Sequence, residues 1–247
     1  NLAKNSIAVL FLGSNIWLSR QSGYFDTSNL FKPLMHTWSL SIEEQFYLIF
    51  PILLFLSFKF LKYQVKWVCL VLVMISLFYF VSNYSEYPTN SFYYPHARAW
   101  ELLVGACVFL FGKKEIEIFK NFRIIDYASF LCLLWFILFF DANSSNFEFL
   151  ISIPVMATGI LIYNMNNTIP SNLIKVLSNS FFVFVGKISY SLYLWHWVLY
   201  SFFWYIFIRD MSHFEILIYL ALLFPISYFS WKYIELTFRY NHFSIEI

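Results

Sequence analysis

The chain has 247 residues, of which 60% are hydrophobic, 24% are aromatic and only 12% are charged. A soluble domain of this length would carry more charge, so the composition excludes an ordinary globular protein and indicates a polytopic membrane protein. The formal net charge is +2, so no nucleic-acid partner is expected.

Apolar runs follow one another along nearly the whole chain. A transmembrane helix needs about 20 mainly apolar residues, and the predicted spans cover residues 46–61, 66–82, 97–112, 124–140, 147–163, 184–208 and 214–236. The first apolar run, Ser6 to Leu18, is shorter and could be one short span, the end of a longer span or a re-entrant segment. We therefore predict an all-α polytopic integral membrane protein, in which residues 1–247 form a single membrane domain with a bundle of about seven or eight transmembrane helices.

Basic residues divide unequally between alternate loops. One set of loops holds twelve lysines and arginines, whereas the other set holds Arg20, Lys32, Arg98 and Arg209. Because cytoplasmic loops are enriched in basic residues, the first set is predicted to be cytoplasmic. This orientation places the C-terminus in the cytoplasm and the polar segment at residues 36–45 at the outer face.

The cysteines indicate neither a metal nor a disulfide. Cys69, Cys107 and Cys132 all lie inside apolar runs, without the spacing of a metal site or of a pair. We interpret them as small hydrophobic residues and expect no metal.

The first polar cluster, residues 36–47 (HTWSLSIEEQFY), directly precedes a long apolar run. If one of its two serines caps a helix that starts near Ile42, Glu43 and Glu44 occupy the first turn, where a helix N-terminus favours negative charge. A cap accounts for one carboxylate, but not for the histidine, tryptophan and glutamine of the same string. The cluster is therefore either a helix end or part of a site.

Two charged pairs occur at helical spacing. Arg98 and Glu101 are three residues apart at the outer end of a predicted span, and Glu235 and Arg239 are four apart at the inner end of the last one. Each pair can form an ion pair along one helix face and be functionally inert. Alternatively, Arg98 holds a carboxylate of the first cluster across helices or contacts an anionic group of a substrate.

A polar stripe runs through the predicted span at 184–208. Ser189, Tyr193, His196 and Tyr200 fall at i, i+4, i+7 and i+11, which is one face of a helix. A lone histidine in a bundle is usually an interhelical hydrogen-bonding group. With hydroxyls on both sides, the stripe could instead line a polar path or a site.

These strings occur in the order found in the membrane acyltransferase-3 family, and the chain resembles that family over nearly its whole length. The resemblance rests on residues 36–47 with Pro51, on Arg98 to Gly105, on Gly186 to His196 and on Ile234 to Arg239. Shorter pieces, Ser14-Asn15 and Gly23 to Phe25, agree as well.

The resemblance implies a bacterial inner-membrane enzyme with many spans. Such enzymes move an acyl group, most often acetyl, from acyl-CoA on the cytoplasmic side to a hydroxyl of a cell-envelope or exported glycan. The implied partners are the lipid bilayer and a glycan or lipid-linked glycan acceptor. The family also has N-terminal helices with an arginine and a histidine, the latter regarded as its key catalytic residue, and these have no counterpart here. We therefore expect a C-terminal portion of a longer acyltransferase, inactive on its own.

The resemblance and the polar clusters together define a composite candidate site. Glu43, Glu44, His36 and His196 are the candidate catalytic residues, with Glu43 or Glu44 orienting the histidine expected upstream. Candidate substrate-binding residues are Trp38, Gln45, Arg98, Glu101, Ser189, Tyr190, Tyr193, Glu235 and Arg239.

Two other classes of function stay open at this point. In a transporter or lipid-linked glycan flippase, Glu101, His196 and Glu235 would be proton or substrate relays. Transporters usually consist of paired halves, and the sequence shows no such symmetry. The other alternative is a non-catalytic remnant that only interacts with membrane proteins.

Overall fold

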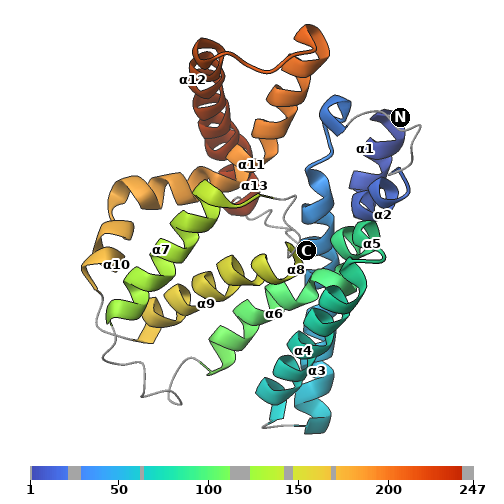
Figure 1. Ribbon diagram of the computed structural model, residues 1–247, viewed down its shortest axis with the longest axis vertical. Coiled ribbons are helices and arrows are strands. Elements are labelled where there is room, and N and C mark those ends of the chain that lie inside the picture. The colour runs from blue at the N-terminus through green and yellow to red at the C-terminus, as the bar shows by residue number, and fades with distance from the viewer. Residues whose placement is uncertain are drawn as a thin grey trace, which may run out of the picture. The chain divides into compact units, whose positions relative to one another are not determined.

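The computed structural model describes residues 2–21, 29–61, 64–111, 123–141, 147–167 and 171–240, and all regular structure in these ranges is helical (Figure 1). The chain divides into two compact units, one of Asn1–Trp38 with Ser178–Ile247 and one of Ser39–Leu177. We call them the first and the second unit and describe each by itself.

The first unit contains a long helical hairpin. Its elements are α1 (Leu2–Leu10), α2 (Ser14–Ser19), η1 (Asn29–Phe31), the start of α3 (Thr37–Leu61), α11 (Ser180–Phe207), α12 (His213–Phe229), the π-helical segment η4 (Ser230–Glu235) and α13 (Leu236–Tyr240). Helices α11 and α12 pack side by side (Figure 1).

Local capping explains where the two hairpin helices begin and end. The Asn179 side chain accepts a hydrogen bond from the amide of Phe181 at the start of α11. At its end Ile208 adopts the left-handed conformation, with φ 53°, and the chain turns. Ser212 and Glu215 then form a capping box that starts α12.

The first apolar run is not a continuous helix. It forms α1 and α2, which are separated by Leu12 in the left-handed conformation with φ 56°. The amide of Gly13 donates to the Ala8 carbonyl at 2.8 Å, as at a helix C-terminus. The run Ser6 to Leu18 is therefore divided between two short helices.

The second unit packs around one aromatic core. Its helices are most of α3, α4 (Val65–Tyr84), α5 (Pro88–Tyr93), α6 (Pro95–Phe111), α7 (Arg123–Phe139), α8 (Phe147–Leu150), α9 (Ser152–Asn167) and α10 (Asn172–Leu177). Trp100 of α6 and Phe80 of α4 are fully buried at the centre of this core. On the other side of the unit, the buried Asn164 of α9 donates to a carboxylate oxygen of Asp126 of α7 at 2.7 Å.

One serine joins α4 to the backbone of α6. The Ser76 hydroxyl donates to the His96 carbonyl at 2.7 Å and accepts from the Trp100 amide at 3.0 Å. In an uninterrupted α-helix that amide would bond to that carbonyl directly, since they are four residues apart. The hydroxyl therefore lies within the hydrogen-bond ladder of α6.

Four segments among the described residues are long and apolar enough to cross a membrane: Thr37–Leu61, Val65–Tyr84, Phe147–Met165 and His213–Arg239. They overlap four of the predicted spans, and the shorter apolar helix Ile124–Phe139 overlaps a fifth. Residues 97–111 and 184–207 are helical, as expected. Several apolar helices are thus confirmed, whereas a bundle of seven or eight transmembrane helices is not established.

Candidate functional site

The polar stripe of α11 faces the turn that precedes α3. The ring of His36 lies 5.3 Å from that of Tyr193 and 5.6 Å from that of His196, measured between ring centroids. The Tyr193 hydroxyl donates to the backbone carbonyl of His36. Two motifs that are about 160 residues apart in the sequence therefore meet in one cluster, which we call the histidine cluster (His36, Tyr193 and His196).

Two further side chains of α11 hold the same irregular segment. Trp197 donates from its indole nitrogen to the Lys32 carbonyl at 2.9 Å, and Ser201 donates to the Leu30 carbonyl at 2.8 Å. Tyr193, Trp197 and Ser201 are spaced by four residues, so they lie on one helix face. The backbone of an irregular segment needs such partners, and here they fix the segment that carries His36.

The hydrogen bonds of His196 indicate its tautomer. Its Nδ1 lies 2.5 Å from the Tyr193 carbonyl, and a carbonyl can only accept a hydrogen bond. The neutral ring therefore carries its hydrogen on Nδ1 and a lone pair on Nε2, which can accept a proton. On the other side of the backbone, the Tyr219 hydroxyl of α12 donates to the His196 carbonyl at 2.9 Å and fixes this turn of α11.

His36 is a buried imidazole that stays neutral. Its exposed fraction is 7%, and neither ring nitrogen makes a hydrogen bond within the described ranges. Burial, and to a smaller degree the neighbouring His196, lower the pKa of His36 from its ordinary value of 6.5 to about 4, while the nearby carbonyls of Leu194 and Pro33 act in the opposite direction. Buried polar atoms are normally hydrogen-bonded. The ring nitrogens of His36 are therefore suited to form a hydrogen bond with a polar group that enters the cluster.

The stripe is shorter than the sequence predicts. Ser189 is exposed and donates to the Gly186 carbonyl of its own helix at 2.8 Å, and Tyr190 is 44% exposed. The buried hydroxyl on this part of α11 belongs instead to Ser191, which the sequence analysis did not select. It donates to Glu235 at 3.3 Å.

The two predicted ion pairs are both present. Glu235 and Arg239 pair at 3.0 Å where η4 passes into α13. In the second unit, Nε of Arg98 lies 2.7 Å from Glu101 Oε1 and its Nη2 lies 3.0 Å from Oε2, which is a bidentate pair within α6. The guanidinium also lies 5.3 Å from the centre of the Phe92 ring.

The helix at the first polar cluster begins earlier than expected. Amides donate from Thr37 to Leu34 and from Trp38 to Met35, and α3 begins at Thr37. The serines of the string therefore lie inside the helix and do not cap it, because backbone bonding of the preceding turn already starts the helix.

The acidic residues of this string lie beyond the first turn of α3, which contains none. Glu43 and Glu44 are half-buried and form no ion pair within the described ranges. The alternative in which Arg98 holds one of these carboxylates is thus not found among the described residues. Trp38 and Gln45 are half-buried as well.

With this geometry established, comparison with known proteins decides the family. Residues 5–232 match the acyltransferase domain of the acyltransferase-3 family. The chain belongs to this family. No solved structure matches it.

Relatives of this acyltransferase-3 chain are O-acetyltransferases by name. It is 31% identical to the peptidoglycan O-acetyltransferase OatA of Listeria monocytogenes, over 98% of the chain and 41% of that relative. It is also 31% identical to the O-acetyltransferase OatA of Staphylococcus aureus (strain NCTC 8325 / PS 47), over 79% of the chain and 34% of the relative. The chain thus spans about two fifths or less of the length of these relatives.

The acyltransferase-3 chain offers basic residues at one end of its hairpin. Because α11 and α12 run antiparallel, the start of α11 meets the end of α12, where the Phe184 ring lies 6.0 Å from that of Tyr228. Lys187, Lys232 and Arg239 belong to this end. Among the described residues no three histidine, cysteine or acidic side chains could hold a metal ion. Residues 23–25, which also resemble the family, lie outside the described ranges.

Proposed function

We propose that this chain is part of a membrane enzyme that transfers an acetyl group from acyl-CoA to a hydroxyl of a cell-wall glycan. The family match and the O-acetyltransferase relatives support this reaction class. At the level of residues, the proposal depends on one observation: the buried, neutral His36 lies against His196, whose Nδ1 is held at the Tyr193 carbonyl so that Nε2 is the acceptor atom of the ring.

In the proposed reaction, an imidazole of the histidine cluster accepts the proton of the glycan hydroxyl. The hydroxyl oxygen attacks the thioester carbonyl carbon, the C–S bond breaks, and the thiolate of CoA takes up a proton. A neutral imidazole is the appropriate base for this step, and its contribution is typically about 10²- to 10⁴-fold. Glu43 or Glu44 is proposed to orient the histidine of the family's N-terminal helices.

The donor is proposed to approach from the basic end of the hairpin. Lys187, Lys232 and Arg239 would contact the phosphates of acyl-CoA. Nine residues separate Lys187 from His196 on α11, which is about 14 Å along the helix axis. The extended pantetheine arm of CoA can reach over such a length, with Ser189 and Tyr190 beside its route.

In the first unit, Trp38 is proposed to offer an aromatic face to a sugar ring of the acceptor. In the second unit, Gln45 is proposed to offer an amide to sugar hydroxyls, and Arg98 with Glu101 to contact the glycan as a pair. Because Glu101 and Glu235 each pair with an arginine of their own chain segment, the relay function that a transporter would need is less well supported.

Deletion and complementation of the full-length gene would test the proposal. Mass spectrometry of the cell-wall glycan should show acetyl groups with the wild-type gene and none in the deletion strain. His196→Ala should reduce acetylation by about 10²-fold or more, whereas His213→Ala, at an exposed histidine at the start of α12, should leave it unchanged. An unchanged acetyl content in the deletion strain would contradict the proposed reaction and favour a transporter or a non-catalytic remnant.

A further inference from the structure

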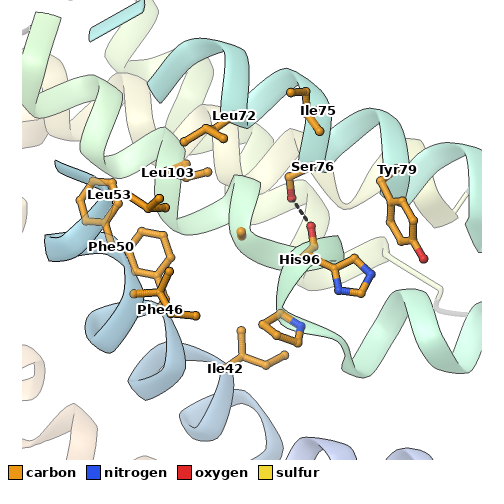
Figure 2. A pocket seen from close by; sticks show the side chains of 13 residues that line it. Ile42, Phe46, Phe50, Leu53, Leu72, Ile75, Ser76, Tyr79, His96 and Leu103 are labelled. Atoms are coloured by element: carbon orange, nitrogen blue, oxygen red, sulfur yellow. Dashed lines mark hydrogen bonds between the residues drawn. The ribbon is translucent and has the colours of Figure 1, made fainter. Parts of the chain in front are cut away.

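A groove with a volume of about 360 Å³ lies between α3, α4 and α6 of the second unit. Figure 2 shows Phe46, Phe50 and Leu53 of α3 on one side of it and Leu72 and Leu103 on the other. Ten of the thirteen lining side chains are hydrocarbon, and the other three are Ser76, Tyr79 and His96. No part of the histidine cluster belongs to this groove.

The groove lies on helices suited to the bilayer. Both α3 and α4 are long and apolar enough to cross a membrane. Ile49 and Ile75 line the groove and are still 51% and 60% exposed, so it is open along one side. Hydrocarbon is therefore the medium that meets the open side, and lipid chains can enter without crossing water.

One end of the groove is polar. His96 and Tyr79 lie there together, with their rings 4.6 Å apart (Figure 2). This end is near the residue at which α6 begins, Pro95, and is thus close to a helix terminus. The neighbouring Ser76 hydroxyl is engaged with the α6 backbone, whereas no hydrogen bond of the His96 ring occurs among the described residues.

We propose that the groove binds one acyl chain of a membrane phospholipid, with the phosphate-bearing headgroup beside His96 and Tyr79. An extended acyl chain matches the lining in chemistry, because ten of the thirteen lining side chains are hydrocarbon. A phosphate oxygen can accept a hydrogen bond from the imidazole and from the tyrosine hydroxyl.

Retention of the lipid depends on packing and on the headgroup. The bilayer is as apolar as the groove, so the hydrophobic effect does not favour one location over the other. The chain gains van der Waals contacts with the fixed walls, and the headgroup gains the hydrogen bonds at His96 and Tyr79. The apolar walls and the polar end of the groove therefore both contribute to retention of the lipid, and each contribution can be tested separately.

Photo-crosslinking of the full-length protein in lipid nanodiscs tests the chain site. The probe is phosphatidylglycerol with a photoreactive diazirine in one acyl chain, and labelled residues are found by mass spectrometry of peptides. Labelling should concentrate on groove residues of α3, and Ala99→Phe, which fills the groove, should reduce it several-fold. The matched variant Ala128→Phe, on an exposed position of α7, should leave it unchanged.

A second pair of variants keeps the test independent of any one substitution. Leu53→Trp narrows the groove from α3, and Leu131→Trp, at a 62% exposed position of α7, is its control. His96→Phe should keep labelling in the groove but let the lipid exchange several-fold faster. Labelling spread evenly over the lipid-facing helices, or unaffected by both groove variants, would overturn the proposal, as would crosslinks from the groove to another polypeptide segment. None of these measurements depends on acetyl transfer.

Discussion

The two units use side-chain hydrogen bonds to backbone groups for different purposes. In the second unit, Ser76 joins two regular helices that already pack around Trp100. In the first unit, Tyr193, Trp197 and Ser201 of one helix hold an irregular segment that has little regular structure of its own.

In the second unit such bonds add to the stability of a packed core, whereas in the first unit they fix the position of a segment. The aromatic core of the second unit is stabilised mainly by apolar burial, to which the hydrogen bonds of Ser76 are added. The segment before α3 is placed by three directed bonds, and it carries the buried His36. A segment that is placed by directed hydrogen bonds can hold a reactive side chain in one position, whereas an apolar core mainly stabilises the fold against unfolding.

The largest effect is expected in the aromatic core. Trp100→Ala removes a fully buried side chain and should lower the free energy of unfolding by about 3–5 kcal/mol. Thermal unfolding of the full-length protein in detergent, followed by circular dichroism, would measure it. Trp67→Ala, at a 54% exposed tryptophan of α4, is the control. Equal losses for both variants would mean that burial in this core is not what stabilises the unit.

A smaller loss is expected at the contact between α4 and α6. Ser76→Ala leaves the His96 carbonyl and the Trp100 amide without the serine and should cost about 1–3 kcal/mol. Ser82→Ala, on an exposed face of α4, should be nearly neutral. If α6 instead restored its own ladder, the loss would fall to that of the control, and the serine would have no stabilising function.

Acidification should weaken the first unit through His36. The pKa of His36 is about 4 in the folded protein, below its ordinary value of 6.5, so the folded state favours the neutral ring. The contribution of the neutral His36 to the free energy of unfolding is therefore complete above pH 6.5 and is lost as the pH falls from there towards 4. Unfolding measured across this range should show the decline in the wild type and a flatter profile in His36→Phe. An identical pH profile in the two proteins would show that His36 does not cause the loss of stability at low pH.

The smallest effect is expected from a single bond of the α11 face. Trp197→Phe keeps the ring but removes the donor to the Lys32 carbonyl, at a cost of about 1 kcal/mol. Because that bond helps to place the segment with His36, modification of histidines by diethyl pyrocarbonate should become faster. Trp204→Phe is the control, since the indole nitrogen of Trp204 donates to the Tyr200 hydroxyl of its own helix and the variant keeps an aromatic ring beside Phe31. Equal histidine reactivity in both variants would show that the bond does not place His36.

Local pairs were predictable from the sequence, whereas long-range contacts were not. The pairs Arg98–Glu101 and Glu235–Arg239 follow from helical spacing alone. The meeting of His36 with His196 depends on how the chain returns over many residues, which no local pattern encodes.

Residues that bond to backbone were also missed. Trp197 and Ser201 are not among the candidate site residues of the sequence, because their partners are carbonyls of a distant irregular segment. Their spacing of four from Tyr193 is the signal that could have indicated a shared face. The start of α3 was placed too late, since the serine pattern was given more weight than the turn before it.

The π-helical segment η4 changes how the last helix presents its side chains. A π turn contains about one residue more than an α turn, and each residue of an α-helix turns by about 100°. Side chains after Ser230–Glu235 are therefore rotated relative to the phase set by α12. Glu235 faces Ser191 in this rotated frame. Loss of one residue from η4 would preserve a helix of similar length and composition, yet it would turn the side chains that follow by about 100° relative to α12.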